Sequence, residues 1–334
     1  MDTDLKKKIT TASNQNSLIL IMWLILTLVF QVVLYVVAMI FSPTVDPEML
    51  DRVYNLAAYL AQYVGAVPLA ILISKSIFGD KGSPSFRTAF QKPQASGGQL
   101  VRWIFISFFF IYGTAIASNL LFTLLEAITG IELHSVDMTT DENLLSRITS
   151  VISMMFLAPF FEETMFRANI VRNGSRFGSW NIIIITGLTF GLWHCNYEQL
   201  LYAGVMGICA GFLTVKTRSV IPSLVLHFIM NTIGTVQSMT LGTLDQDKLN
   251  DTEYIMSNLG AAIAMMCSSG IMYALVITGL VLFIIELNSH KDTFVLDDPV
   301  PEKGEVTKTY LTAPLTIIMF LVFIGATLLR AFVI

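Results

Sequence analysis

Residues 149–171 read TSVISMMFLAPFFEETMFRANIV, an apolar run interrupted near its middle by two adjacent glutamates and an arginine. The run is long enough to cross a bilayer as a helix, which takes about 20 residues. An ionisable side chain at membrane depth is costly, so it is normally kept only where it faces a bundle interior and serves a function. The two glutamates, Glu162 and Glu163, therefore mark this stretch as the candidate functional site.

Composition sets the class of protein. Hydrophobic residues make up 54% of the 334 residues and charged residues only 13%, whereas about 25% of a typical soluble protein is charged. Such a chain is too apolar for a soluble globule. We therefore predict an all-α protein, a polytopic transmembrane helix bundle.

Nine segments are long and apolar enough to cross a bilayer, although the fifth and sixth are short. They are 17–41, 53–78, 101–129, 149–171, 180–194, 199–215, 220–240, 259–287 and 313–333. The first segment is longer than the apolar core of a signal peptide, and no small-residue cleavage site follows it. It is therefore expected to remain as an anchor.

Charge asymmetry predicts the orientation of these spans. If the amino terminus is cytoplasmic, the cytoplasmic loops collect most basic residues, as the positive-inside rule requires. They contain Lys6, Lys7, Lys8, Lys75, Lys81, Arg87, Lys92, Arg102, Arg172, Arg176, Lys216, Arg218, Lys291, Lys303 and Lys308. The outer loops contain only the basic residues Arg52, Arg147 and Lys248, and their acids are Asp46, Glu48, Asp51, Glu132, Asp137, Asp141, Glu142, Asp245, Asp247, Asp251 and Glu253. The net charge of −4 is thus divided across the membrane and indicates no nucleic-acid partner.

Polar breaks divide the chain into three parts of one membrane domain. Residues 1–130 hold three amino-terminal helices with a basic cytoplasmic loop, residues 149–240 form a core, and residues 259–334 add two carboxyl-terminal helices. The three cysteines, Cys195, Cys209 and Cys267, lack the spacing of a metal site and are interpreted as small buried apolar residues.

The core contains three polar motifs. Glu163 and Arg167 are four residues apart and share a helix face, so they can form an ion pair, while Glu162 points about 100° away. A desolvated carboxylate without a counter-ion suits a general base or acid. The structural alternative is that both glutamates pair with Arg167 and fasten helices together, but that leaves one acid unexplained.

The second motif pairs Phe190 with His194, and the third pairs His227 with Asn231, each with four-residue spacing. Taken alone, His194 is more typical of an interfacial hydrogen-bonding residue, and the third motif is more typical of a polar clamp between helices. The predicted depths of these residues in the bilayer favour a common functional site instead. Counted from the predicted cytoplasmic helix ends at 1.5 Å per residue, Glu162 and the polar residues of both motifs lie at roughly 12 to 22 Å, so they can meet in one layer.

The three motifs together, Glu162-Glu163 with Arg167, Phe190 with His194, and His227 with Asn231, resemble those of the CAAX protease and bacteriocin-processing (CPBP, or ABI) family of intramembrane endopeptidases. One departure is Ala168, where the family commonly has glycine. The resemblance implies that Glu162 with His194 activates a water molecule for attack on a peptide carbonyl. It implies further that His227 with Asn231 stabilises the oxyanion and that Glu163, Arg167 and Phe190 support them.

The resemblance leaves metal dependence open. Glu162, His194 and His227 could supply three zinc ligands with water as the fourth. The His-Glu-x-x-His signature of zinc proteases is absent, however, and we favour a metal-independent glutamate-activated water. The expected partners are the lipid bilayer and a peptide or protein substrate, and the expected location is the cell membrane, taken as a bacterial plasma membrane.

A function of a different class stays open. Buried acids and histidines also form proton relays, so a proton-coupled carrier is possible, as is a non-proteolytic immunity or scaffold factor. A carrier would more often have repeated halves and broken helices, which we do not find in the sequence. The loops do not select between prenyl-tail processing and bacteriocin maturation or immunity.

Overall fold

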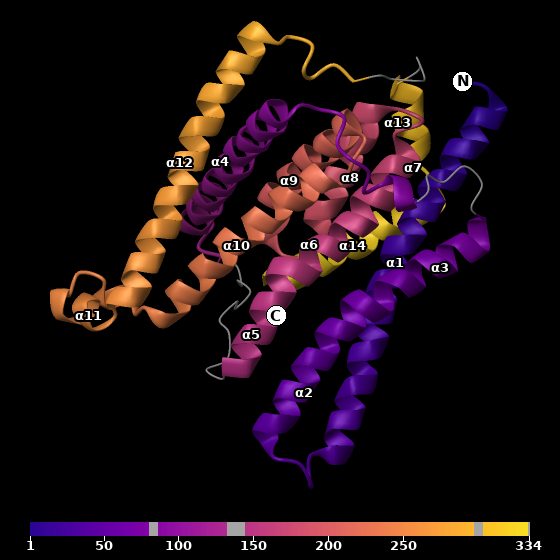
Figure 1. Ribbon diagram of the computed structural model, residues 1–334. Helices are drawn as coiled ribbons and strands as arrows, with labels where there is room; N and C mark the ends of the chain where they lie inside the picture. Colours follow the sequence, from indigo (N-terminus) through magenta and orange to yellow (C-terminus); the bar gives the residue numbers. More distant parts are fainter. Residues whose placement is uncertain (80–85, 132–143, 297–302, 333–334) are drawn as a thin grey trace.

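The computed structural model describes residues 1–79, 86–131, 144–296 and 303–332, and within these ranges the chain is helical with no strand (Figure 1). This confirms the predicted all-α class. Some residues of the sequence analysis lie outside the described ranges: Lys81, Glu132, Asp137, Asp141 and Glu142. Residue 333, which ends the last predicted span, and residue 334, which ends the third predicted part, also lie outside them.

Each of the nine predicted spans is helical. They correspond to α1 (Thr3–Phe41); α2 (Pro47–Leu60), η1 (Ala61–Ala66) and α3 (Val67–Phe78) in succession; α4 (Gly97–Thr129); α5 (Leu144–Ile152), η3 (Ser153–Leu157), α6 (Ala158–Glu163), η4 (Thr164–Val171) and α7 (Arg172–Gly174) in succession; α8 (Ser179–Trp193); α9 (Tyr197–Thr217); α10 (Ile221–Thr243); α12 (Leu259–Ser289); and α14 (Pro314–Phe332). The remaining short elements are η2 (Phe86–Thr88), η5 (Gln246–Lys248), α11 (Thr252–Ser257) and α13 (Lys303–Leu311).

Seven helices among the described residues are long and apolar enough to cross a membrane. The other two predicted spans are α8, with only 15 residues, and the fourth span, which is divided into α-helical and π-helical pieces. Large apolar side chains are exposed along α1, α12 and α14, as expected of surfaces that face lipid. The chain is therefore a multi-pass membrane protein.

Loops predicted on the cytoplasmic side contact one another. The backbone N–H of Gln94 donates to the carbonyl of Thr217 at 2.8 Å, and that of Val220 donates to the carbonyl of Ala89 at 2.8 Å. The ammonium of Lys216 reaches the carbonyl of Val295 at 2.9 Å. Segments far apart in sequence thus meet at one end of the bundle, as an alternating nine-span topology requires.

The hydrophobic core draws on the amino-terminal, central and carboxyl-terminal parts of the chain. In Figure 1, α4 lies beside α12 on one flank, α8 and α9 occupy the middle, and α1 runs along the other flank. Trp23 of α1 is fully buried and stacks on Trp193 of α8 at 4.0 Å between ring centroids, while Phe323 of α14 packs edge-on against the same Trp193. The carboxyl-terminal end of α8 is thereby held from outside the core segment.

Glycines allow α8 and α9 to pack with their backbones in contact. A Cβ atom on Gly207 would lie 2.7 Å from the Cα of Gly187, and one on Gly191 would overlap the carbonyl oxygen of Leu200. Small residues commonly permit such close approach between membrane helices. The sequence analysis did not identify this contact, which holds Phe190 and His194 against the rest of the core.

The fourth span is not the regular α-helix that the sequence analysis assumed. Pro159 opens α6 and has no N–H to donate to the preceding turn, and the π-helical η3 lies immediately before it. A second π-helical stretch, η4, begins directly after Glu163. Single π-helical turns in α-helices often occur at functional sites, because they redirect side chains by one extra residue.

Candidate active site

Glu163 and Arg167 form the ion pair expected from their spacing. The Oε1 atom of Glu163 lies 3.1 Å from a terminal nitrogen of Arg167, and both side chains are fully buried. The guanidinium also lies over the ring of Phe190, 4.5 Å from its centroid. An aromatic face attracts a cation. The carboxylate of Glu163 and the ring of Phe190 therefore both stabilise the buried positive charge of Arg167.

His227 joins this pair to the other glutamate. Its Nδ1 lies 2.9 Å from Oε1 of Glu163, and its Nε2 lies 3.7 Å from Oε2 of Glu162. Because an ionised carboxylate only accepts hydrogen bonds, Nδ1 is the donor in the contact with Glu163. Nε2 of the same ring then faces Glu162.

Glu162 is the acid without a cation of its own. Its residue is only 7% exposed, and among the described residues its Oε2 has no hydrogen-bond partner. The family resemblance paired Glu162 with His194, but in the structure the imidazole beside it is that of His227. The two neighbouring acids therefore have different surroundings, as their spacing predicts.

His194 is attached to this cluster through Phe190. It follows the last residue of α8, and its Nδ1 lies 2.8 Å from the carbonyl oxygen of Phe190. Its ring meets the Phe190 ring edge-on at 4.9 Å between centroids, and the same phenyl ring meets His227 at 5.8 Å. Phe190 thus contacts both imidazoles and Arg167, and the local hydrogen bond leaves Nε2 of His194 available.

Asn231 makes a contact that its spacing did not predict. Its side-chain nitrogen donates to the carbonyl oxygen of Met154 in η3 at 2.8 Å, so α10 is tied to the π-helical part of the fourth span. The sequence analysis expected Asn231 and His227 to donate toward a common point. A carboxamide has two N–H groups, and one of them is used in this contact.

The cluster lies within a segment that matches a known family. Residues 144–233 match the model of the Rce1-like family, described as type II CAAX prenyl endopeptidase Rce1-like. This segment is therefore similar to CAAX prenyl endopeptidases of the Rce1-like family. The matched segment contains all three motifs, from Glu162 to Asn231, whereas the residues before 144 and after 233 lie outside it. Neither a curated protein nor a solved structure matches the chain.

The departure at Ala168 from the usual CPBP glycine is accommodated by packing. Ala168 is 2% exposed and forms a small apolar cluster with Ala89 and Val220, at the start of α10. Its methyl group therefore lies against the element that carries His227. The charged cluster is unaffected, because Arg167 still reaches Glu163.

Several residues around the CPBP core were missed by the sequence analysis. Phe166 packs edge-on against Phe190 at 4.9 Å, and Tyr63, from the second span, stacks on Phe161 at 6.0 Å next to Glu162. Phe166 could have been found from its place beside Arg167. Tyr63 could not, because nothing in the sequence relates the second span to the fourth.

The three candidate zinc ligands are not gathered into a metal site. Within the part of the chain that the structure describes, no group of three or more His, Cys, Asp and Glu side chains is placed to hold a metal ion. Nδ1 of His194 contacts a backbone carbonyl and Nδ1 of His227 contacts Glu163, so Nε2 is the remaining ring nitrogen of each histidine. We derive no step through a metal.

Proposed function

We propose that the protein is an intramembrane endopeptidase that hydrolyses peptide bonds of membrane-associated or prenylated-type peptides. The match of residues 144–233 to the Rce1-like family model supports a CAAX-type endopeptidase. The mechanism that we propose is attack by a water molecule that Glu162 activates. The catalytic residues are Glu162, His194, His227 and Asn231, and Glu163, Arg167 and Phe190 position them.

The observation that supports Glu162 as the base is the division of roles between the two acids. Glu163 is occupied by Arg167 and by His227. Glu162 is also buried, but among the described residues it forms no ion pair with an arginine, and Nε2 of His227 lies 3.7 Å from its Oε2. A water molecule can contact both atoms at hydrogen-bond distance, and a carboxylate in this environment can remove a proton from it.

In the proposed reaction, the oxygen of this water attacks the carbonyl carbon of the scissile peptide bond. Glu162 takes the proton, and the carbonyl oxygen becomes an oxyanion. The free N–H of Asn231 and the Nε2–H of His227, whose imidazole is the cation in this proposal, donate to that oxyanion. The carbon–nitrogen bond then breaks, and the proton passes from Glu162 to the departing amine.

His194 assists at the water in this proposal. Its Nδ1 is held by the Phe190 carbonyl, so its neutral ring offers Nε2 as an acceptor. Catalytic hydrogen bonds are often long or misaligned before substrate binds. We therefore expect His194 and Asn231 to close on the scissile bond only when a peptide occupies the site.

The test is cleavage of a defined peptide by the purified full-length protein in lipid nanodiscs. A farnesylated peptide with a carboxyl-terminal tripeptide, and the same peptide on a transmembrane anchor, are incubated with wild type and with Glu162→Gln, and products are identified by mass spectrometry. We expect wild type to give a discrete product that Glu162→Gln does not give. If neither protein cleaves either peptide while Glu162→Gln keeps the biological role, the function is the non-proteolytic alternative.

A further inference from the structure

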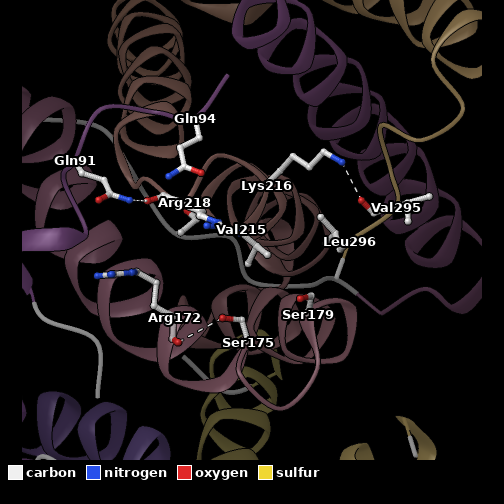
Figure 2. Close-up of a pocket in the computed structure, with 11 residues that line it drawn as sticks. Gln91, Gln94, Arg172, Ser175, Ser179, Val215, Lys216, Arg218, Val295 and Leu296 are labelled. Atoms are coloured by element: carbon white, nitrogen blue, oxygen red, sulfur yellow. Dashed lines mark hydrogen bonds between the residues drawn. The ribbon is translucent and has the colours of Figure 1, made fainter. Parts of the chain in front are cut away.

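A polar cavity of about 570 Å³ lies at the predicted cytoplasmic end of the bundle (Figure 2). Its walls come from the segment before α4, the connection between α7 and α8, the end of α9 and the residues that follow α12. None of the catalytic residues proposed above lines it. A volume between about 300 and 1,000 Å³ is typical of small-molecule sites.

The charge of the cavity wall is one-sided. Among the described residues that line it are three cations, Arg172, Lys216 and Arg218, and no carboxylate. The three side chains come from two different elements and surround the cavity in Figure 2. Like charges held in a common recess repel one another, so an anion between them is favoured.

The cations are held in place by the protein. Arg172 donates to the hydroxyl of Thr88 at 2.6 Å, and Lys216 donates to the carbonyl oxygens of Asp292 and Val295 at 3.2 and 2.9 Å. These acceptors are neutral. A guanidinium has five N–H donors and an ammonium has three.

The amino-terminal end of α8 adds a further positive potential. Ser179, its first residue, lines the cavity beside Ser175. The residue before it is Gly178, and no side chain caps the first turn of α8. Backbone N–H groups and the helix dipole at such an end favour phosphate groups.

The opposite wall is apolar and exposed. Val295 and Leu296 line the cavity on the side of the chain that leaves α12, and Val295 is 62% exposed. In the orientation predicted from loop charges, this wall lies at the cytoplasmic surface of the bilayer. A ligand there meets cations on one side and apolar side chains on the other.

We propose that this cavity binds a phosphate group carried by an anionic lipid headgroup at the cytoplasmic surface. Arg172 and Arg218 bind the phosphate oxygens, the serine hydroxyls and the start of α8 complete the site, and Val295 with Leu296 contacts the apolar part of the lipid. The site is separate from the proposed peptidase centre.

The test measures thermal unfolding of the full-length protein in dodecyl maltoside with three probes: phosphatidylglycerol, phosphatidylcholine and inorganic phosphate. A ligand that binds the folded state raises the unfolding midpoint in a concentration-dependent way. We expect phosphatidylglycerol to raise the midpoint and phosphatidylcholine to leave it unchanged. Inorganic phosphate that competes with phosphatidylglycerol would show that the phosphate alone is recognised, and failure to compete would show that the lipid is required.

Variants of the lining residues test whether phosphatidylglycerol binds in this cavity. Arg218→Gln alters an exposed side chain, and Arg172→Gln/Arg218→Gln removes both guanidinium groups. Each should weaken binding of phosphatidylglycerol by at least about tenfold, the effect of about 1.4 kcal/mol. Lys291→Gln removes an exposed cation on the same predicted side but outside the cavity and should bind normally. No midpoint shift in wild type, or an equal shift in the double variant, would overturn the proposal.

Discussion

His227 is bound to Glu163 through Nδ1 over 2.9 Å, and this contact turns its other ring nitrogen toward the neighbouring acid, Glu162. One imidazole therefore connects the compensated acid with the uncompensated one. Removing the contact should leave His227 in place as a ring but free to change its tautomer and orientation. Through this contact, Glu163 acts by positioning His227 rather than by reacting itself.

Breaking the Glu163–Arg167 pair should lower the free energy of unfolding as well as the activity. Arg167→Met leaves Glu163 buried without its cation, and breaking a buried pair typically costs about 3–5 kcal/mol. Chemical denaturation in mixed micelles measures this loss. The double variant Glu163→Gln/Arg167→Met should recover part of it, because both charges are then absent. Equal destabilisation in both variants would show that the pair does not interact energetically.

His227→Gln should lower turnover strongly with little effect on stability. The neutral amide does not carry the positive charge that the proposed mechanism places beside the oxyanion, and loss of one oxyanion donor costs about 10²–10³ in kcat. Steady-state kinetics should show a fall in kcat with KM nearly unchanged. An unchanged kcat would assign His227 to helix packing instead.

Asn231→Ala tests whether the carboxamide stabilises the oxyanion or only fastens helices. Loss of one oxyanion donor costs about 10²–10³ in kcat, whereas loss of the bond to Met154 alone should cost about 1 kcal/mol of stability. Thr232→Val is a matched control, since the hydroxyl of Thr232 donates to the carbonyl of Phe228 in its own helix and, among the described residues, to no other acceptor. A kcat within threefold of wild type in both variants would contradict the oxyanion role.

Glycine substitutions should distinguish close packing from helix propensity. Gly191→Ala introduces a methyl group against the backbone of Leu200 and Gly204, and overpacking typically costs about 1–3 kcal/mol. Gly325→Ala, in α14, meets nothing within 4 Å and should be neutral or stabilising by about 0.4–1 kcal/mol. If the unfolding midpoint changes in the same direction in both variants, α8 and α9 have room to separate.

Chelators should leave peptidase activity unchanged, because the proposed nucleophile is generated by a carboxylate. Turnover is compared before and after dialysis against 1,10-phenanthroline, with a zinc protease treated in parallel as a positive control. Loss of activity that zinc restores would replace the proposed mechanism with a metal-dependent one.

The sequence was sufficient to predict the helical spans and the buried Glu163–Arg167 pair, because these depend on apolar run length and on four-residue spacing. It was insufficient for the contacts that His194 and Asn231 make with backbone carbonyls. Contacts between helices depend on how the helices rotate against one another, and η3 and η4 change the rotation of the fourth span in a way that a regular 3.6-residue period does not describe.

The contact partners of the core were also beyond sequence reasoning. Trp23 stacks on Trp193, and the cavity with Arg172 and Lys216 is assembled from four connections that are distant in sequence. No local pattern relates such segments. In contrast, the division of the two glutamates into different environments followed from their adjacency alone, since neighbouring helix residues point about 100° apart.

The most direct test of the account is the turnover number of Glu162→Gln compared with Glu253→Gln, which makes the same chemical change at an exposed position in α11. Both proteins are assayed in nanodiscs on the peptide that wild type cleaves, with unfolding midpoints recorded in parallel. We predict that kcat falls by at least about 10²-fold for Glu162→Gln, the lower end of general-base contributions, and stays at the wild-type value for Glu253→Gln. A folded Glu162→Gln protein with wild-type kcat would contradict the claim that Glu162 activates the attacking water.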